Sequence, residues 1–121
     1  MDTDIASITI FLKELLKAEV LDTVLPNMQV LGETLEKIKE ISHNPKKYFD
    51  SNHLFNIDVE NSILVLKLNE LRAKVRELEI YGIKAFIDDK GKVEHREIIQ
   101  ALNRLSSAIY VMMLKGEKEK Y

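Results

Sequence analysis

The chain has no cysteine and no long apolar run. Without cysteine there is no disulfide framework, no thiolate zinc site and no cysteine nucleophile. This composition fits a reducing compartment, so we expect a cytoplasmic protein. The longest apolar run, residues 108–114, is far shorter than the roughly 18 residues that span a bilayer, and residues 1–4 are acidic where a signal peptide would be basic. We therefore expect neither a membrane segment nor a secretion signal.

An excess of positive charge is also missing. Eighteen basic residues stand against twenty acidic ones, which gives a net charge of −2 and a pI near 5.9. The overall charge therefore does not favour nucleic acid or an anionic membrane as a partner. With 121 residues, 45% of them hydrophobic, the chain is long enough for one core. We expect a single helical domain over residues 1–121, with residues 117–121 as a flexible tail after Gly116.

Apolar residues recur at helical spacing in four segments. The first runs from Asp4 to about Leu25, before Pro26, and the second from Asn27 to Ser42. The third covers about residues 57–82 and the fourth about residues 94–115. Residues 43–53 contain turn formers, and residues 83–93 contain an Asp-Lys-Gly turn that could form a short β-hairpin. The pattern predicts an all-α, four-helix bundle-like domain in which the third and fourth helices form a core hairpin.

The third helix carries the strongest pattern, a heptad stripe with alternating steps of four and three residues. The stripe consists of Ile57, Asn61, Leu64, Leu68, Leu71, Val75, Leu78 and Gly82. A second apolar row, made of Ile63, Leu66, Ala73 and Ile80, would be left in water by a two-stranded coiled coil. We therefore expect this helix to be covered on two sides, either within the chain or by a partner. The candidate interface residues are Leu64, Leu68, Leu71, Ile109, Met112 and Met113.

Two basic groups could contact nucleic acid. Lys46 and Lys47 precede Tyr48 and Phe49, a combination of cations and aromatics that can hold a phosphate backbone and stack a base. The second group lies on the third helix and consists of Lys67, Arg72, Lys74 and Arg76. Three glutamates, Glu70, Glu77 and Glu79, are mixed with it. The mixed charges favour ordinary solvated helix faces over a nucleic-acid site.

Metal binding has weak support. Residues 86–97 resemble an EF-hand loop in the positions of Gly91, Val93 and Glu97, but Phe86 and Lys90 stand where oxygen ligands are needed. An ordinary turn before a helix explains the segment better. The histidines, His43, His53 and His95, lack the spacing of known ligand sets. We predict no metal and no cofactor.

Catalytic patterns are missing as well. The chain shows no Gly-rich phosphate loop, and its acidic residues fall mostly on predicted solvent faces or caps. We expect a non-enzymatic helical interaction protein, either a homo-oligomer or a small subunit of a larger assembly, with no small-molecule ligand. One alternative is a nucleic-acid-associated protein, such as a subunit of a ribonucleoprotein effector complex or a transcriptional regulator. A second alternative is a small helical enzyme with a pocket between subunits, in which residues 94–97 are the first candidates.

Overall fold

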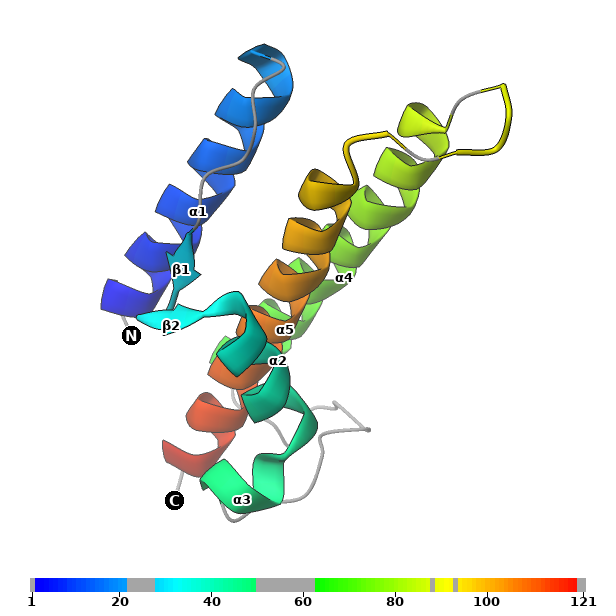
Figure 1. The fold of residues 1–121 in the computed structure, drawn as a ribbon. Coiled ribbons are helices and arrows are strands. Elements are labelled where there is room, and N and C mark those ends of the chain that lie inside the picture. Colours follow the sequence, from blue (N-terminus) through cyan, green and yellow to red (C-terminus); the bar gives the residue numbers. More distant parts are fainter. Residues whose placement is uncertain (1, 22–27, 50–62, 88, 93, 120–121) are drawn as a thin grey trace.

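The structure, a computed structural model, describes residues 2–21, 28–49, 63–87, 89–92 and 94–119 (Figure 1). Its elements are α1 (Asp2–Leu21), β1 (Gln29–Val30), β2 (Glu33–Thr34), α2 (Leu35–His43), α3 (Pro45–Phe49), α4 (Ile63–Phe86) and α5 (Arg96–Glu119). The fold is mostly helical with one small antiparallel hairpin, so the predicted all-α, bundle-like class is confirmed. The single-domain assignment stays a prediction.

Helix α5 lies at the centre of this arrangement. It packs along α4 as the long antiparallel hairpin that the heptads predicted, and α1, α2 and α3 contact it from other sides (Figure 1). Its residues from Ala108 to Leu114 are all buried, which is why the sequence is apolar on nearly every side there. The helix also continues through Gly116 to Glu119, so Gly116 does not end it. Residues 120 and 121 of the expected tail lie outside the described residues.

The contact between α4 and α5 follows a row of α4 residues that we call the α4 seam. The seam consists of Val65, Leu68, Arg72, Val75, Glu79, Gly82 and Phe86, all of them buried or half-buried. Leu64, Leu71 and Leu78 of the predicted heptad stripe are instead 36%, 41% and 51% exposed. The packed face is therefore rotated from the predicted one, and it includes an arginine and a glutamate in place of three leucines.

The second predicted helix was expected to begin at Asn27, and this start is wrong for residues 28–34. They form the β1–β2 hairpin instead, and its turn has positive φ angles of 55° at Leu31 and 76° at Gly32. Two successive residues with positive φ are typical of a tight hairpin turn and are incompatible with a helix. Helix α2 begins only after Thr34, whose hydroxyl accepts the backbone N–H of Lys37 at 3.2 Å. The Thr34 N-cap and Gly32 therefore determine where the helix begins, although the apolar spacing extends further toward the N-terminus.

Other boundaries also differ from the prediction. The expected loop after residue 43 contains the short helix α3, which starts at Pro45, a favoured first helical position. Helix α4 extends to Phe86, beyond the predicted end at residue 82, while residues 57–62 lie outside the described part. In the described part of residues 83–93 there is a turn and one isolated bridge residue, Ile87, but no two-stranded hairpin.

Two apolar surfaces remain uncovered by the described chain. On α4, Ile63 and Ile80 of the second predicted row are 73% and 54% exposed, and on α1, Ile10 and Val20 are 62% and 75% exposed. The expected cover on both sides of α4 is therefore not supplied by the described residues. Within the described ranges, no helix combines the length and the apolar character that a membrane crossing needs.

Candidate functional site

A polar cluster interrupts the apolar contact between α4 and α5. Arg72 and Glu79 belong to the α4 seam, Arg76 lies one turn after Arg72, and Asn103 of α5 bonds to Glu79. Their positions follow from the antiparallel register, because Val65 meets Gly116 near one end of the hairpin and Phe86 meets His95 at the other. The hairpin therefore brings together residues that lie more than 20 positions apart in the sequence.

Arg72 is the most unusual member of the cluster. Its guanidinium is half-buried, with the carbon Cζ 4.8 Å from the ring centre of Tyr110, and its Nε atom is buried without a hydrogen-bond partner. Burial lowers the pKa of Arg72, and the positive charge of Arg76 lowers it further. Among the described residues no carboxylate lies within ion-pair distance of either arginine. Since a half-buried charge is costly without a partner, this pair is suited to an external anion.

Glu79 and Asn103 link the two helices beside the arginines. The Asn103 amide donates to Oε1 of Glu79 at 3.2 Å, and its carbonyl oxygen accepts from Arg104 at 2.9 Å. Glu79 is thereby engaged with an amide and does not neutralise Arg72. The cluster offers two guanidinium groups for an anion and a neighbouring polar row that can donate and accept hydrogen bonds.

In the first predicted basic group, Lys47 and Tyr48 form contacts with other side chains of this chain. Lys37 and Lys47 each bond to Glu40 at 3.2 Å, and Lys37 also donates to the Tyr48 hydroxyl at 2.9 Å. Hydrogen bonds from Tyr48, Lys37 and Lys47 lower the pKa of Glu40 to about 2. Both lysines also lie over the Tyr48 ring. This network joins α2 to α3.

The remaining predicted residues fall into two groups. Lys67 and Lys74 are exposed on α4, away from the seam, so the structure separates them from Arg72. The proposed interface residues Leu68, Ile109, Met112 and Met113 are buried in the chain's own core. Leu64 and Leu71 stay exposed, and their role in an interface stays a prediction.

Residues 94–97 lie at the start of helix α5. The backbone carbonyl of His95 accepts the N–H groups of Ile98 and Ile99, and the His95 ring packs against Phe86 at 4.9 Å between ring centres. Within the described ranges no three metal-ligating side chains gather, and Phe86, the first position of the EF-hand-like loop, is engaged with this ring. Two positions of that loop, 88 and 93, lie outside the described residues.

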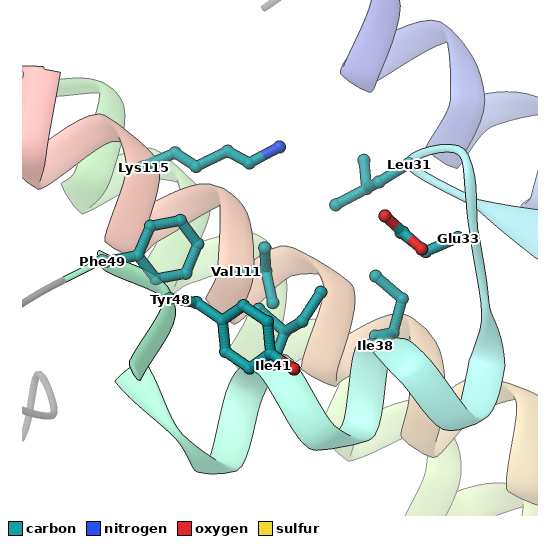
Figure 2. A pocket seen from close by; sticks show the side chains of 8 residues that line it. All are labelled: Leu31, Glu33, Ile38, Ile41, Tyr48, Phe49, Val111 and Lys115. Carbon is teal, nitrogen blue, oxygen red and sulfur yellow. The ribbon is translucent and has the colours of Figure 1, made fainter. Parts of the chain in front are cut away.

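A small cavity lies on another side of α5, where α2, α3 and the hairpin meet it (Figure 2). Its volume is about 200 Å³, and its lining residues are Leu31, Glu33, Ile38, Ile41, Tyr48, Phe49, Val111 and Lys115. Figure 2 shows an apolar floor with Glu33 and Lys115 at the rim. Sites for drug-sized ligands usually measure roughly 300–1,000 Å³, so this cavity holds at most a small group.

Comparison with known proteins gives one consistent result. Residues 18–115 match the family model described as cobalamin adenosyltransferase. The corrinoid adenosyltransferase EutT of Salmonella typhimurium (strain LT2) is 36% identical over 103 residues, which cover 85% of this chain and 38% of that protein. EutT of Escherichia coli (strain K12) is 36% identical over 110 residues, or 91% and 41%. The chain thus spans about two fifths of the length of these relatives. No solved structure matches it.

These findings overturn the functional predictions from the sequence. The relatives are enzymes by name, so the expected non-enzymatic interaction or oligomer role is wrong, and so is the expectation of no small-molecule ligand. Side chains that act as nucleophiles or bases are poor markers of this chemistry. Group transfer between two bound ligands depends instead on residues that bind and orient them. Because the family model matches most of its length, this chain belongs to the cobalamin adenosyltransferase family.

Proposed function

We propose that this chain forms the helical part of a corrinoid adenosyltransferase and that Arg72 and Arg76 bind the phosphates of its nucleotide donor. The observation that carries the proposal is the half-buried Arg72 guanidinium beside the exposed Arg76, neither of them paired with a carboxylate among the described residues, in a member of this family. The cytoplasmic location expected from the sequence forms part of the proposal and is supported by the absence of cysteine.

The chemistry of adenosyl transfer explains why such a pair is needed. The 5′ carbon of adenosine must form a bond to the corrinoid metal while its bond to a phosphate oxygen breaks. ATP is the ordinary donor for such a step, and triphosphate then leaves with the bonding electron pair. The corrinoid supplies the new electron pair and must be reduced beforehand. Guanidinium groups that contact the phosphates would stabilise the negative charge of the leaving group.

The location of the pair also fits this role. Arg72 and Arg76 are one turn apart on α4, so both can reach the same polyphosphate. The Glu79 and Asn103 side chains extend the polar surface by one further turn. The cavity of Figure 2 lies on a different side of α5 and is too small for a corrin ring, so we assign neither substrate to it.

Calorimetric titration with ATP tests the proposal. A hydrogen-bonded charge contact contributes roughly 1.5–3 kcal/mol, so Arg72→Gln and Arg76→Gln should each weaken ATP binding about 10-fold or more. Lys74→Gln is the matched control, because it removes the same charge from the exposed face of the same helix and should change the Kd less than about 3-fold. Equal effects of all three variants, or no ATP binding by the unaltered chain, would refute the proposed phosphate site.

Activity supplies the second measurement. A cobalamin kept reduced by a chemical reductant should be adenosylated in the presence of ATP, which the absorbance spectrum follows. Arg72→Gln should slow this conversion more than Lys74→Gln does. If the chain binds ATP but forms no adenosylated corrinoid, the nucleotide site stands while the transfer activity assigned to this chain is wrong.

A further inference from the structure

The ring of Tyr110 lies directly against the guanidinium of Arg72. Tyr110 comes from α5 and is only 6% exposed, whereas Arg72 comes from α4, and 4.8 Å separate the guanidinium carbon from the ring centre. A cation over the face of an aromatic ring within about 6 Å is attracted by the negative charge of that face. The α5 core residue therefore contacts the charged group on which the proposed phosphate site depends.

This contact stabilises the partly desolvated guanidinium of Arg72. A guanidinium that has lost part of its water shell would otherwise turn toward solvent or toward a carboxylate. The Tyr110 ring compensates for some of that loss, because its negative face lies 4.8 Å from the guanidinium carbon. A ring can do so without competing for hydrogen-bond donors, because the N–H groups of a guanidinium lie along its edge. A carboxylate in the same place would occupy those donors.

We propose that Tyr110 is a positioning residue that holds Arg72 by its ring face and leaves the guanidinium edge available for phosphate oxygens. This inference rests on the proposed nucleotide site. It gives a role to an aromatic ring at a position where any apolar side chain of similar size would fill the core.

The first experiment observes the contact without nucleotide. In an NMR spectrum of the 15N-labelled chain, the Nε–H signal of Arg72 should be shifted upfield by the ring and should be assignable through its loss in Arg72→Lys. Tyr110→Phe should keep the shift, because the ring remains, while Tyr110→Leu should return the signal to the range of exposed arginines. An unshifted Arg72 signal in the unaltered chain would overturn the inference, whatever the chain binds.

The second experiment measures the consequence for ATP binding. Cation–π contacts correspond to roughly 3- to 30-fold in an equilibrium constant, so Tyr110→Leu should weaken ATP binding by that factor and Tyr110→Phe by less than about 2-fold. Met113→Leu is the control for a conservative change at a neighbouring buried position of α5. Urea unfolding of each variant reports whether it folds, and if Tyr110→Leu does not, Tyr110→Met takes its place.

A double-variant cycle separates positioning from simple packing. In an Arg72→Gln background, Tyr110→Leu should cause no further loss of ATP affinity, because the ring then has no guanidinium to hold. An equal loss in both backgrounds would mean that Tyr110 acts through the core alone, which would refute the inference. If Arg72→Gln itself leaves ATP binding unchanged, the proposed phosphate site fails, while the NMR result still decides whether Tyr110 holds Arg72.

Discussion

Replacing Gly82 with alanine tests the close approach of α4 and α5 that creates the polar cluster. Gly82 lies in the interior of α4, where alanine usually stabilises a helix by about 1 kcal/mol relative to glycine. A Cβ atom built on Gly82 would lie only 2.6 Å from Cδ1 of Ile99 on α5. Overpacking typically costs about 1–3 kcal/mol, and the lower half of that range applies here, because the crowded atom is the end of a half-buried side chain that can turn aside in part. The two effects oppose each other, and we expect Gly82→Ala to lower the free energy of unfolding by up to about 1 kcal/mol.

The Ile99→Val variant removes the atom with which the new methyl group would clash. On its own it should cost about 0.5–1.5 kcal/mol, as for other isoleucine truncations. In its presence Gly82→Ala should become stabilising by up to about 1 kcal/mol, so the two changes should be coupled by about 1–2 kcal/mol. Urea unfolding of the four proteins, followed by circular dichroism, measures this coupling. If Gly82→Ala has the same effect in both backgrounds, the helices do not approach each other at this point.

Two further predictions concern the N-terminal half. Gly32 has a φ angle of 76° and open space around an added Cβ, so Gly32→Ala should cost about 1 kcal/mol through conformation alone, and Gly32→Asn should cost less in the same urea titration. The pKa of Glu40 is lowered to about 2, so its network stabilises the fold above pH 4.5 and is lost as the pH falls toward 2. Glu40→Gln should therefore be less stable than the unaltered chain at pH 7 and equally stable near pH 2. A difference that persists at pH 2 would contradict this assignment, although solvent screening keeps the whole effect small.

The long helices were predictable from the sequence because their apolar spacing is repeated over many turns. The prediction placed α4 and α5 as a hairpin, and the structure confirms it. The β1–β2 hairpin was missed because Met28 and Leu31 happen to fit a helical spacing with the residues of α2. Gly32 is the local signal of the turn, and Thr34 is the local signal of the helix start. Each signal consists of one residue, whereas a periodic apolar pattern is supported by several.

Only part of the proposed phosphate site could be predicted from the sequence. Arg72 and Arg76 were recognised as basic residues, but they were grouped with Lys67 and Lys74 as one face for nucleic acid. The partner residue Asn103 was missed entirely, since it lies 24 residues from Glu79 and only the register of two packed helices brings them together. Sequence spacing within one helix does not report that register.

The α4 seam itself shows where the prediction failed and why the failure is informative. The predicted heptad stripe and the α4 seam both contain Leu68, Val75 and Gly82. They differ in the residues between these positions, which are leucines in the stripe and include Arg72 and Glu79 in the seam. The sequence predicted that the face with the three leucines is packed, because burial of apolar side chains is favourable. The structure packs the flank that contains Arg72 and Glu79 against α5 and leaves the leucines 36%, 41% and 51% exposed. Charged residues at a helix contact cost stability, and such local conflicts concentrate at functional sites. The rotated seam is thus an independent reason to propose a site at Arg72, and it predicts that Arg72→Leu would stabilise the fold while weakening ATP binding about 10-fold or more.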